Sequence, residues 1–292
     1  MEAAEFFQYV IAGLKSGSIY ALVALGFTVV YGSTGIINFA QGEFFMLGGV
    51  LAVFFAGLGL PLPLAGIAAV IMTAAIGIAF ERVALRPQRS GSPIVLIIIT
   101  IGGSMVFKSL ARHLFGPDEL TLAEFTPGPS IDMAGVAIER QALWVWGLTA
   151  IAVVVLAVLY RKTKLGRAMR ASSISHDAAR LMGIDTARVV MVSFGIAAAL
   201  GALAGVAVTP LTQTAWDAGA TIGVKGFASA ILGGLGNPVA SVIGGLVLGL
   251  LESLSVAFVS STYKDAISLV VLLVVLFVRP QGLFGRARRE KV

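Results

Sequence analysis

The chain has 292 residues, of which 58% are hydrophobic and only 12% are charged. Because soluble domains carry about 25% charged residues, this composition excludes an ordinary water-soluble fold. The formal net charge of +6 does not indicate nucleic-acid binding, since the basic residues gather in two loops and the C-terminal tail. The lack of cysteine excludes disulfides, iron–sulfur clusters and cysteine-bound zinc.

Uncharged apolar stretches recur along the chain, and each is long enough as a helix to cross roughly 30 Å of hydrocarbon. They lack the alternation of polar and apolar residues that a transmembrane β-barrel needs. We therefore predict an all-α, polytopic membrane protein with one domain over residues 1–292 and a first helix retained as an anchor. Eight or nine membrane segments are expected, because two of the nine candidates are short: 8–31, 36–58, 62–81, 93–115, 142–160, 188–209, 224–236, 239–258 and 264–279.

The second segment is interrupted near its start by three polar side chains, Asn38, Gln41 and Glu43. A carboxylate inside an apolar run needs a cavity, a partner or a proton. Glu43 therefore either faces a passage, where it meets a substrate ammonium, or has a structural role as a hydrogen-bond acceptor.

The loops give the orientation. Residues 82–89, residues 161–188 and the tail from Arg279 are basic, whereas residues 116–141 are acidic. By the positive-inside rule, the basic regions are expected in the cytoplasm, and 116–141 is expected to be an external loop. The N-terminus then lies outside, and residues 224–258 must enter and leave on one face, as two crossings or as a re-entrant hairpin.

The cytoplasmic loop contains a short element with its own start and stop signals. Asp177 lies where the first helical turn favours an acid, Gly183 can end the helix, and Asp185 can cap the next one. Ala178 and Ala179 would give this helix a small, flat face that is suited to a groove on a soluble partner. The alternative is a short linker that only joins two spans.

The turn Gly233–Pro238 interrupts a second apolar segment in the other half of the chain. Paired interruptions of this kind point to a transporter's site, because unwound backbone at membrane depth must face protein or water. Close packing between helices is the alternative for the same residues. The candidate pathway residues are thus Asn38, Gln41, Glu43, Gly234, Gly236 and Asn237. Lys15 and Lys225 are interpreted as snorkelling residues near span ends.

Several blocks, in order along the chain, resemble the permease subunits of branched-chain amino acid ABC importers. Residues 177–183 are similar to the EAA loop of ABC importer permeases, with Asp177 in place of the usual Glu and with Ala178, Ala179 and Gly183 matching. Gln41 departs from the family pattern, which has His at that position. The other matching blocks are Gly17–Gly32, Gly35–Glu43, Gly226–Pro238 and Arg279–Gly285.

The resemblance implies one component of a larger machine in the bacterial cytoplasmic (inner) membrane. Such a permease works with a homologous second permease, two ATP-binding subunits and an external substrate-binding protein, and it binds no nucleic acid. It is not an enzyme, and it forms half of a pathway for branched-chain or related amino acids. The sequence has no Gly-x-x-x-x-Gly-Lys-Ser/Thr loop, so no cofactor is expected in this chain, and ATP would be used by the partner subunits.

Other interpretations remain open from the residues alone. An ion-coupled secondary transporter would also carry paired interrupted segments and an intramembrane Glu43, and a passive channel is a further possibility. Within the same family, urea, short amides and other amino acids are alternative substrates.

Overall fold

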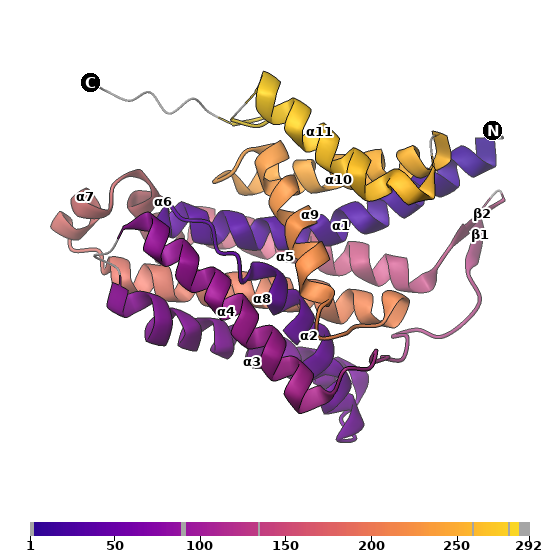
Figure 1. Cartoon of the computed structure of the whole chain (residues 1–292), viewed down its shortest axis with the longest axis horizontal. Coiled ribbons are helices and arrows are strands. Elements are labelled where there is room, and N and C mark those ends of the chain that lie inside the picture. The colour runs from indigo at the N-terminus through magenta and orange to yellow at the C-terminus, as the bar shows by residue number, and fades with distance from the viewer. Residues whose placement is uncertain (1–2, 89–91, 134, 259, 280, 286–292) are drawn as a thin grey trace.

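The computed structural model describes residues 3–88, 92–133, 135–258, 260–279 and 281–285. Arg89 and the basic residues of the tail at 286–292 lie outside the described residues. Long helices dominate the molecule, which confirms the predicted all-α, polytopic class (Figure 1). The α-helices are α1 (Ala3–Thr34), α2 (Gln41–Gly57), α3 (Leu62–Phe80), α4 (Pro93–Phe115), α5 (Arg140–Lys162), α6 (Lys164–Ile174), α7 (His176–Leu181), α8 (Thr186–Thr212), α9 (Ala218–Gly233), α10 (Pro238–Phe258) and α11 (Lys264–Val278).

Short elements complete the described chain. Helix α3 continues through a π-helical turn, η1 (Glu81–Leu85), into a 3-10 turn, η2 (Arg86–Gln88), and a 3-10 turn, η3 (Ser261–Tyr263), precedes α11. Strands β1 (Ile131–Met133) and β2 (Val136–Ile138) pair in antiparallel fashion inside the loop predicted to be external. The side chain of Gln8 on α1 exchanges two hydrogen bonds of 3.0 Å with the backbone of Ala137, so the hairpin is fastened to the first helix.

Among the described residues, 7 helices are long and apolar enough to cross a membrane, and α2 and α9 are shorter apolar helices. The predicted count of eight or nine segments therefore stays a prediction. Helix α9 begins at Ala218, earlier than the segment predicted at 224–236. The glycines of its first turns explain the difference, because Gly219 and Gly223 let the α9 backbone lie directly against Gly42 of α2.

Helices α1 and α8 form the centre of the bundle, with 67% and 72% of their most apolar windows buried. Helix α1 packs along α10, where Gly17 lies against Gly245 and Gly249 so closely that a side chain would collide with backbone. By contrast, only 11% of the corresponding window of α4 and 6% of that of α11 are buried, so these helices present apolar side chains outward. Such faces suit lipid or a second membrane subunit.

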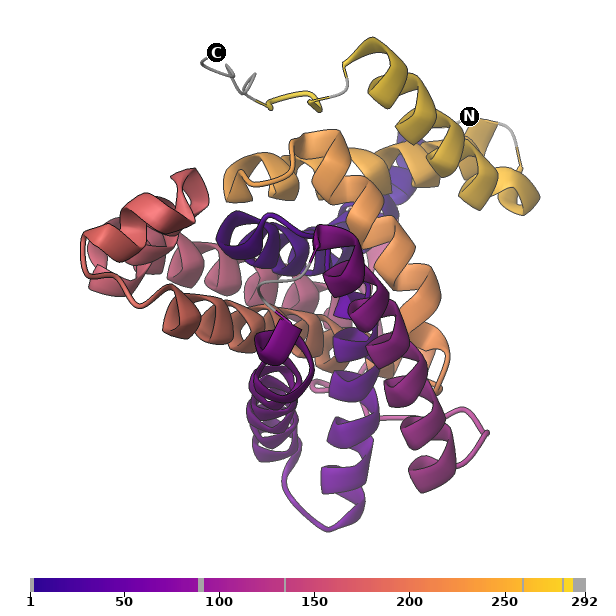
Figure 2. The same cartoon turned by 60° about the vertical axis from the view of Figure 1, so that its left-hand side comes forward.

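The two loops that differ in charge lie at opposite ends of the molecule. Figure 1 shows α6 and α7 at the left end, with the strands β1 and β2 near the N-terminus at the right. Figure 2 shows α6 and α7 projecting from the bundle. This arrangement agrees with the predicted orientation, in which residues 161–188 and 116–141 face opposite sides of the membrane.

Candidate functional site

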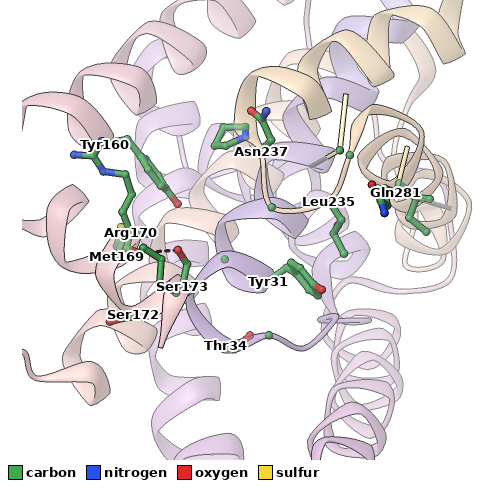
Figure 3. Close-up of a pocket in the computed structure, with 18 of the residues that line it drawn as sticks. Tyr31, Thr34, Tyr160, Met169, Arg170, Ser172, Ser173, Leu235, Asn237 and Gln281 are labelled. Carbon is green, nitrogen blue, oxygen red and sulfur yellow. Dashed lines mark hydrogen bonds between the residues drawn. The ribbon is translucent and has the colours of Figure 1, made fainter. Parts of the chain in front are cut away.

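A large cavity lies at the end of the bundle that carries α6. Its volume is about 1290 Å³, and it is lined by the C-terminal end of α1, by α5 and α6, by the turn between α9 and α10, and by residues after α11 (Figure 3). Tyr31, Thr34, Tyr160, Arg170, Asn237 and Gln281 are among the side chains on its walls. Among the described residues that line the cavity, none carries a carboxylate, whereas Arg161 and Arg170 carry positive charge, so this part of the wall is basic.

The α9–α10 turn is built from glycines that adopt backbone angles unfavourable to other residues. Gly234 has φ +127° and Gly236 has φ +93°. Asn237 begins the next helix, because its side-chain Oδ1 accepts a hydrogen bond of 3.3 Å from the backbone N–H of Ala240. Thus three of the predicted pathway residues lie together at the cavity.

The other three pathway candidates lie elsewhere, between helices. Gln41 is buried between α1 and α8, where its Nε2 donates a hydrogen bond of 2.9 Å to the carbonyl of Ala197. Asn38 is buried too, and its Oδ1 accepts a hydrogen bond of 3.1 Å from the N–H of Ala40. The structure therefore separates the two predicted groups, and the residues before the first group that reach the cavity are Tyr31, Gly32, Thr34 and Gly35.

Glu43 connects α2 to α4. Its Oε1 accepts a hydrogen bond of 2.8 Å from Ser104 Oγ and lies 3.6 Å from Lys108 Nζ. The carboxylate is 2% exposed, and its Oε2, which has no hydrogen-bond partner among the described residues, lies beside Gly219 of α9. Of the two roles open to Glu43, these contacts favour the structural one, because both of its side-chain partners come from one neighbouring helix.

A second ionic cluster lies between α1, α9, α10 and α11, and its members are largely buried except Asp265, whose side chain is 59% exposed. Lys225 Nζ lies 2.6 Å from Glu252 Oε1 and 2.7 Å from Asp265 Oδ1, and Tyr20 donates a hydrogen bond of 2.8 Å to Glu252. The snorkelling interpretation of Lys225 was wrong, since its side chain is only 12% exposed and is paired inside the bundle. A lysine and a glutamate inside two apolar segments joined by one turn are the signal in the sequence that could have indicated this pair.

Lys15 is also paired. Its Nζ lies 2.6 Å from Glu139 Oε2 at the start of α5, so this lysine ties α1 to the loop predicted to be external. The interpretation of Lys15 as a snorkelling residue left out this partner, which lies far away in sequence.

Helix α7 has the start and the end that its sequence predicts. The Ser175 hydroxyl accepts a hydrogen bond of 3.2 Å from the N–H of Ala178, and Gly183, with φ +78°, follows the last turn. Two hydrogen bonds close that turn: Gly183 N–H donates to Arg180, and Ile184 N–H donates to Ala179. This is the Schellman pattern, in which a left-handed glycine ends the helix.

Asp185 then caps α8. Its side chain accepts a hydrogen bond of 3.0 Å from the N–H of Arg188, and this bond holds the pKa of the carboxyl below its usual value.

The flat alanine face predicted for α7 needs a correction. Asp177 and Ala178 are exposed, but Ala179 is buried, because the helix packs back on α6 and α8 through that side. The exposed apolar side chains come instead from Leu181 and Met182, which are 89% and 83% exposed. Within the exposed surface of this element, we call the residues Asp177, Ala178, Leu181 and Met182 the α7 tip.

The sequence pattern of the family described as branched-chain amino acid transport system / permease component matches residues 9–276. The chain belongs to this family. It is 36% identical to the high-affinity branched-chain amino acid transport system permease protein LivH of Escherichia coli (strain K12), with 98% of each chain covered. The corresponding protein BraD of Pseudomonas aeruginosa is 33% identical, with 100% of this chain and 99% of BraD covered.

A solved structure supports the fold of this permease. An inward-facing ABC transporter of the metal-chelate type is similar with a TM-score of 0.50 and 15% sequence identity, over 93% of this chain and 84% of that chain. The resemblance inferred from the sequence blocks is thus confirmed. The chain is a multi-pass membrane permease of the ABC importer kind, a transport component and not an enzyme.

Proposed function

We propose that this permease carries branched-chain amino acids across the bacterial cytoplasmic membrane as one half of the pathway of an ABC importer. It works with a homologous second permease, two ATP-binding subunits and an external substrate-binding protein. The observation that carries the proposal is the identity to LivH over almost the whole of both chains. The weakly buried faces of α4 and α11 supply room for a neighbouring permease.

The cavity beside α6 is proposed as the cytoplasmic end of this pathway. It opens at the basic end of the bundle, and Gly234, Gly236 and Asn237 line it beside the end of α1. Glycines at a turn between two membrane helices allow that turn to move without side-chain collisions. The proposal leaves Asn38, Gln41 and Glu43 as buried residues that pack helices behind the pathway. Gln41 bonds to α8, Glu43 bonds to α4, and Asn38 bonds to the backbone of Ala40 in its own turn.

The α7 tip is proposed as the contact with the ATP-binding subunits. Two exposed apolar residues, Leu181 and Met182, lie at the end of a helix that is capped at both ends. A short helix with exposed apolar side chains can bind in a groove on a soluble partner. Because α7 continues through Asp185 into the central helix α8, a displacement of the tip is transmitted to the core of the bundle.

The substrate class is tested on the cognate external binding protein. Titration calorimetry with leucine, isoleucine, valine, urea and acetamide measures which of these molecules the binding protein takes up and can deliver. We expect tight binding of the branched amino acids and none of urea or acetamide. Binding of urea or the amide instead would overturn the substrate assignment while leaving the family intact.

A further inference from the structure

The last turn of α9 is completed by a segment from the end of the chain. Helix ends leave four backbone carbonyls without partners inside the helix. The N–H of Gly234 satisfies the carbonyl of Ala230, but two further carbonyls accept hydrogen bonds from residues beyond α11. Leu283 N–H donates to Leu232 over 2.8 Å, and Phe284 N–H donates to Gly233 over 2.9 Å.

The contact is close on both sides. A side chain at Gly282, which has φ +80°, would collide with the carbonyl of Ile231, and one at Gly234 would lie 2.8 Å from the backbone nitrogen of Gly285. Glycines are thus required both in the turn and in the segment that covers it. Leu283 also packs on the central hydrophobic cluster, so the segment is fastened by a side chain as well as by its backbone.

Helix α11 lies at the edge of the bundle, where it packs against α9 and α10. Only 6% of its apolar window is buried, yet it is joined to α9 at both ends. At its start, Asp265 pairs with Lys225, and after its end Leu283 and Phe284 bind the last turn of α9. Helix α9 and the C-terminal segment are therefore joined by hydrogen bonds next to the cavity. The wall of the cavity includes Gln281 and Gly285 of this segment.

We propose that residues 281–285 position the α9–α10 turn, so that the wall of the cavity, and with it transport, depends on the N–H groups of Leu283 and Phe284. The effect on transport rests on the proposed function, whereas the positioning itself does not. Without these donors, two buried carbonyls lose their partners, and the turn keeps only its internal hydrogen bonds at Gly234 and Asn237, beside glycines that allow many conformations.

Hydrogen exchange of the complete transporter in lipid nanodiscs tests the positioning directly. In the wild type, the amides of Leu283 and Phe284 should be protected although they lie outside any helix. Rapid exchange at both amides would overturn the proposal without a mutation and whatever the substrate is.

A pair of variants at Phe284, whose side chain is 50% exposed, separates the N–H from the side chain. Phe284→Pro removes the donor, whereas the control Phe284→Ala keeps it. We expect Phe284→Pro to speed exchange in the peptide covering 230–241 by about tenfold, as loss of a buried hydrogen bond does, and to lower uptake comparably. ATP-subunit association should stay normal.

Equal exchange and equal uptake in the two variants would contradict the proposal. If Phe284→Pro does not assemble, Leu283→Pro with its control Leu283→Ala repeats the comparison at the neighbouring donor. A wild-type complex that fails to move any branched amino acid would count against the proposed function, and the exchange result would still decide the positioning.

Discussion

Lys225 of α9 and Glu252 of α10 form a 2.6 Å ion pair across the hairpin that ends at the cavity. The pair is largely enclosed and is extended by Asp265 and Tyr20, so it joins three membrane helices to α1. Removing one member of a buried pair leaves an uncompensated charge, which costs roughly 3–5 kcal/mol.

We therefore expect Lys225→Met to lower the thermal midpoint of the detergent-solubilised permease strongly. The double variant Lys225→Met/Glu252→Gln should recover part of that loss, because the stranded carboxylate is then gone. Fluorescence-detected size-exclusion after heating measures both. A double variant no more stable than the single one would show that the pair is not coupled.

Glu43 should behave as a structural residue. Glu43→Gln keeps the shape but weakens the bonds to Ser104 and Lys108, and the expected loss is about 1–3 kcal/mol of stability, the range for a buried charged hydrogen bond. Lys108→Met is the matched change on the partner side. If Glu43 instead contacts the substrate, Glu43→Gln should strongly reduce uptake while yield and thermal stability stay normal.

The α7 tip should control attachment of the ATP-binding subunits. Leu181→Glu places a charge on an exposed apolar position without disturbing a buried contact, so co-purification of those subunits should fall about tenfold or more. Met133→Glu makes the same kind of change on the predicted external hairpin and should leave association unchanged. Association that survives Leu181→Glu would remove the tip from the interface.

Gly183→Val tests the geometry of the same element. Valine strongly disfavours the φ of +78° observed at Gly183, so the turn into α8 should distort. We expect ATP hydrolysis that is uncoupled from uptake, at normal membrane levels of the permease. The buried Ala179 is unsuitable for this purpose, because Ala179→Glu would break packing inside the loop itself.

Single cysteines test the orientation, since the chain has none of its own. Ser130 and Ser173 are exposed at opposite ends of the molecule, whereas Ser172 is buried and would not react. An impermeant thiol reagent should label Ser130→Cys but not Ser173→Cys in intact cells. The reverse pattern would invert the topology.

Apolar runs and capping residues in the sequence correctly predicted where several helices begin and end. The apolar run at 93–115 coincides with α4, and Gly183 and Asp185 end and start helices as their residue types predict. These features depend on neighbours within a few residues, where backbone conformation and capping decide the outcome.

What the sequence left open depends on contacts between distant segments. The partners of Lys225, the pairing of Leu283 with Leu232 and the burial of Ala179 depend on which helices lie side by side. The six pathway candidates looked alike as polar or glycine interruptions, yet packing places Gln41 inside the bundle and Asn237 at the cavity. Composition cannot separate those two environments.

ATP-driven import of branched-chain amino acids, the function proposed for this permease, can be measured in a reconstituted complex. Proteoliposomes containing the whole complex, with ATP enclosed and the binding protein and labelled leucine outside, test it most directly. We expect leucine to accumulate above the external concentration only when hydrolysable ATP is enclosed. Accumulation driven by a sodium or proton gradient without ATP, or uptake that stops at equilibrium, would contradict the proposed function.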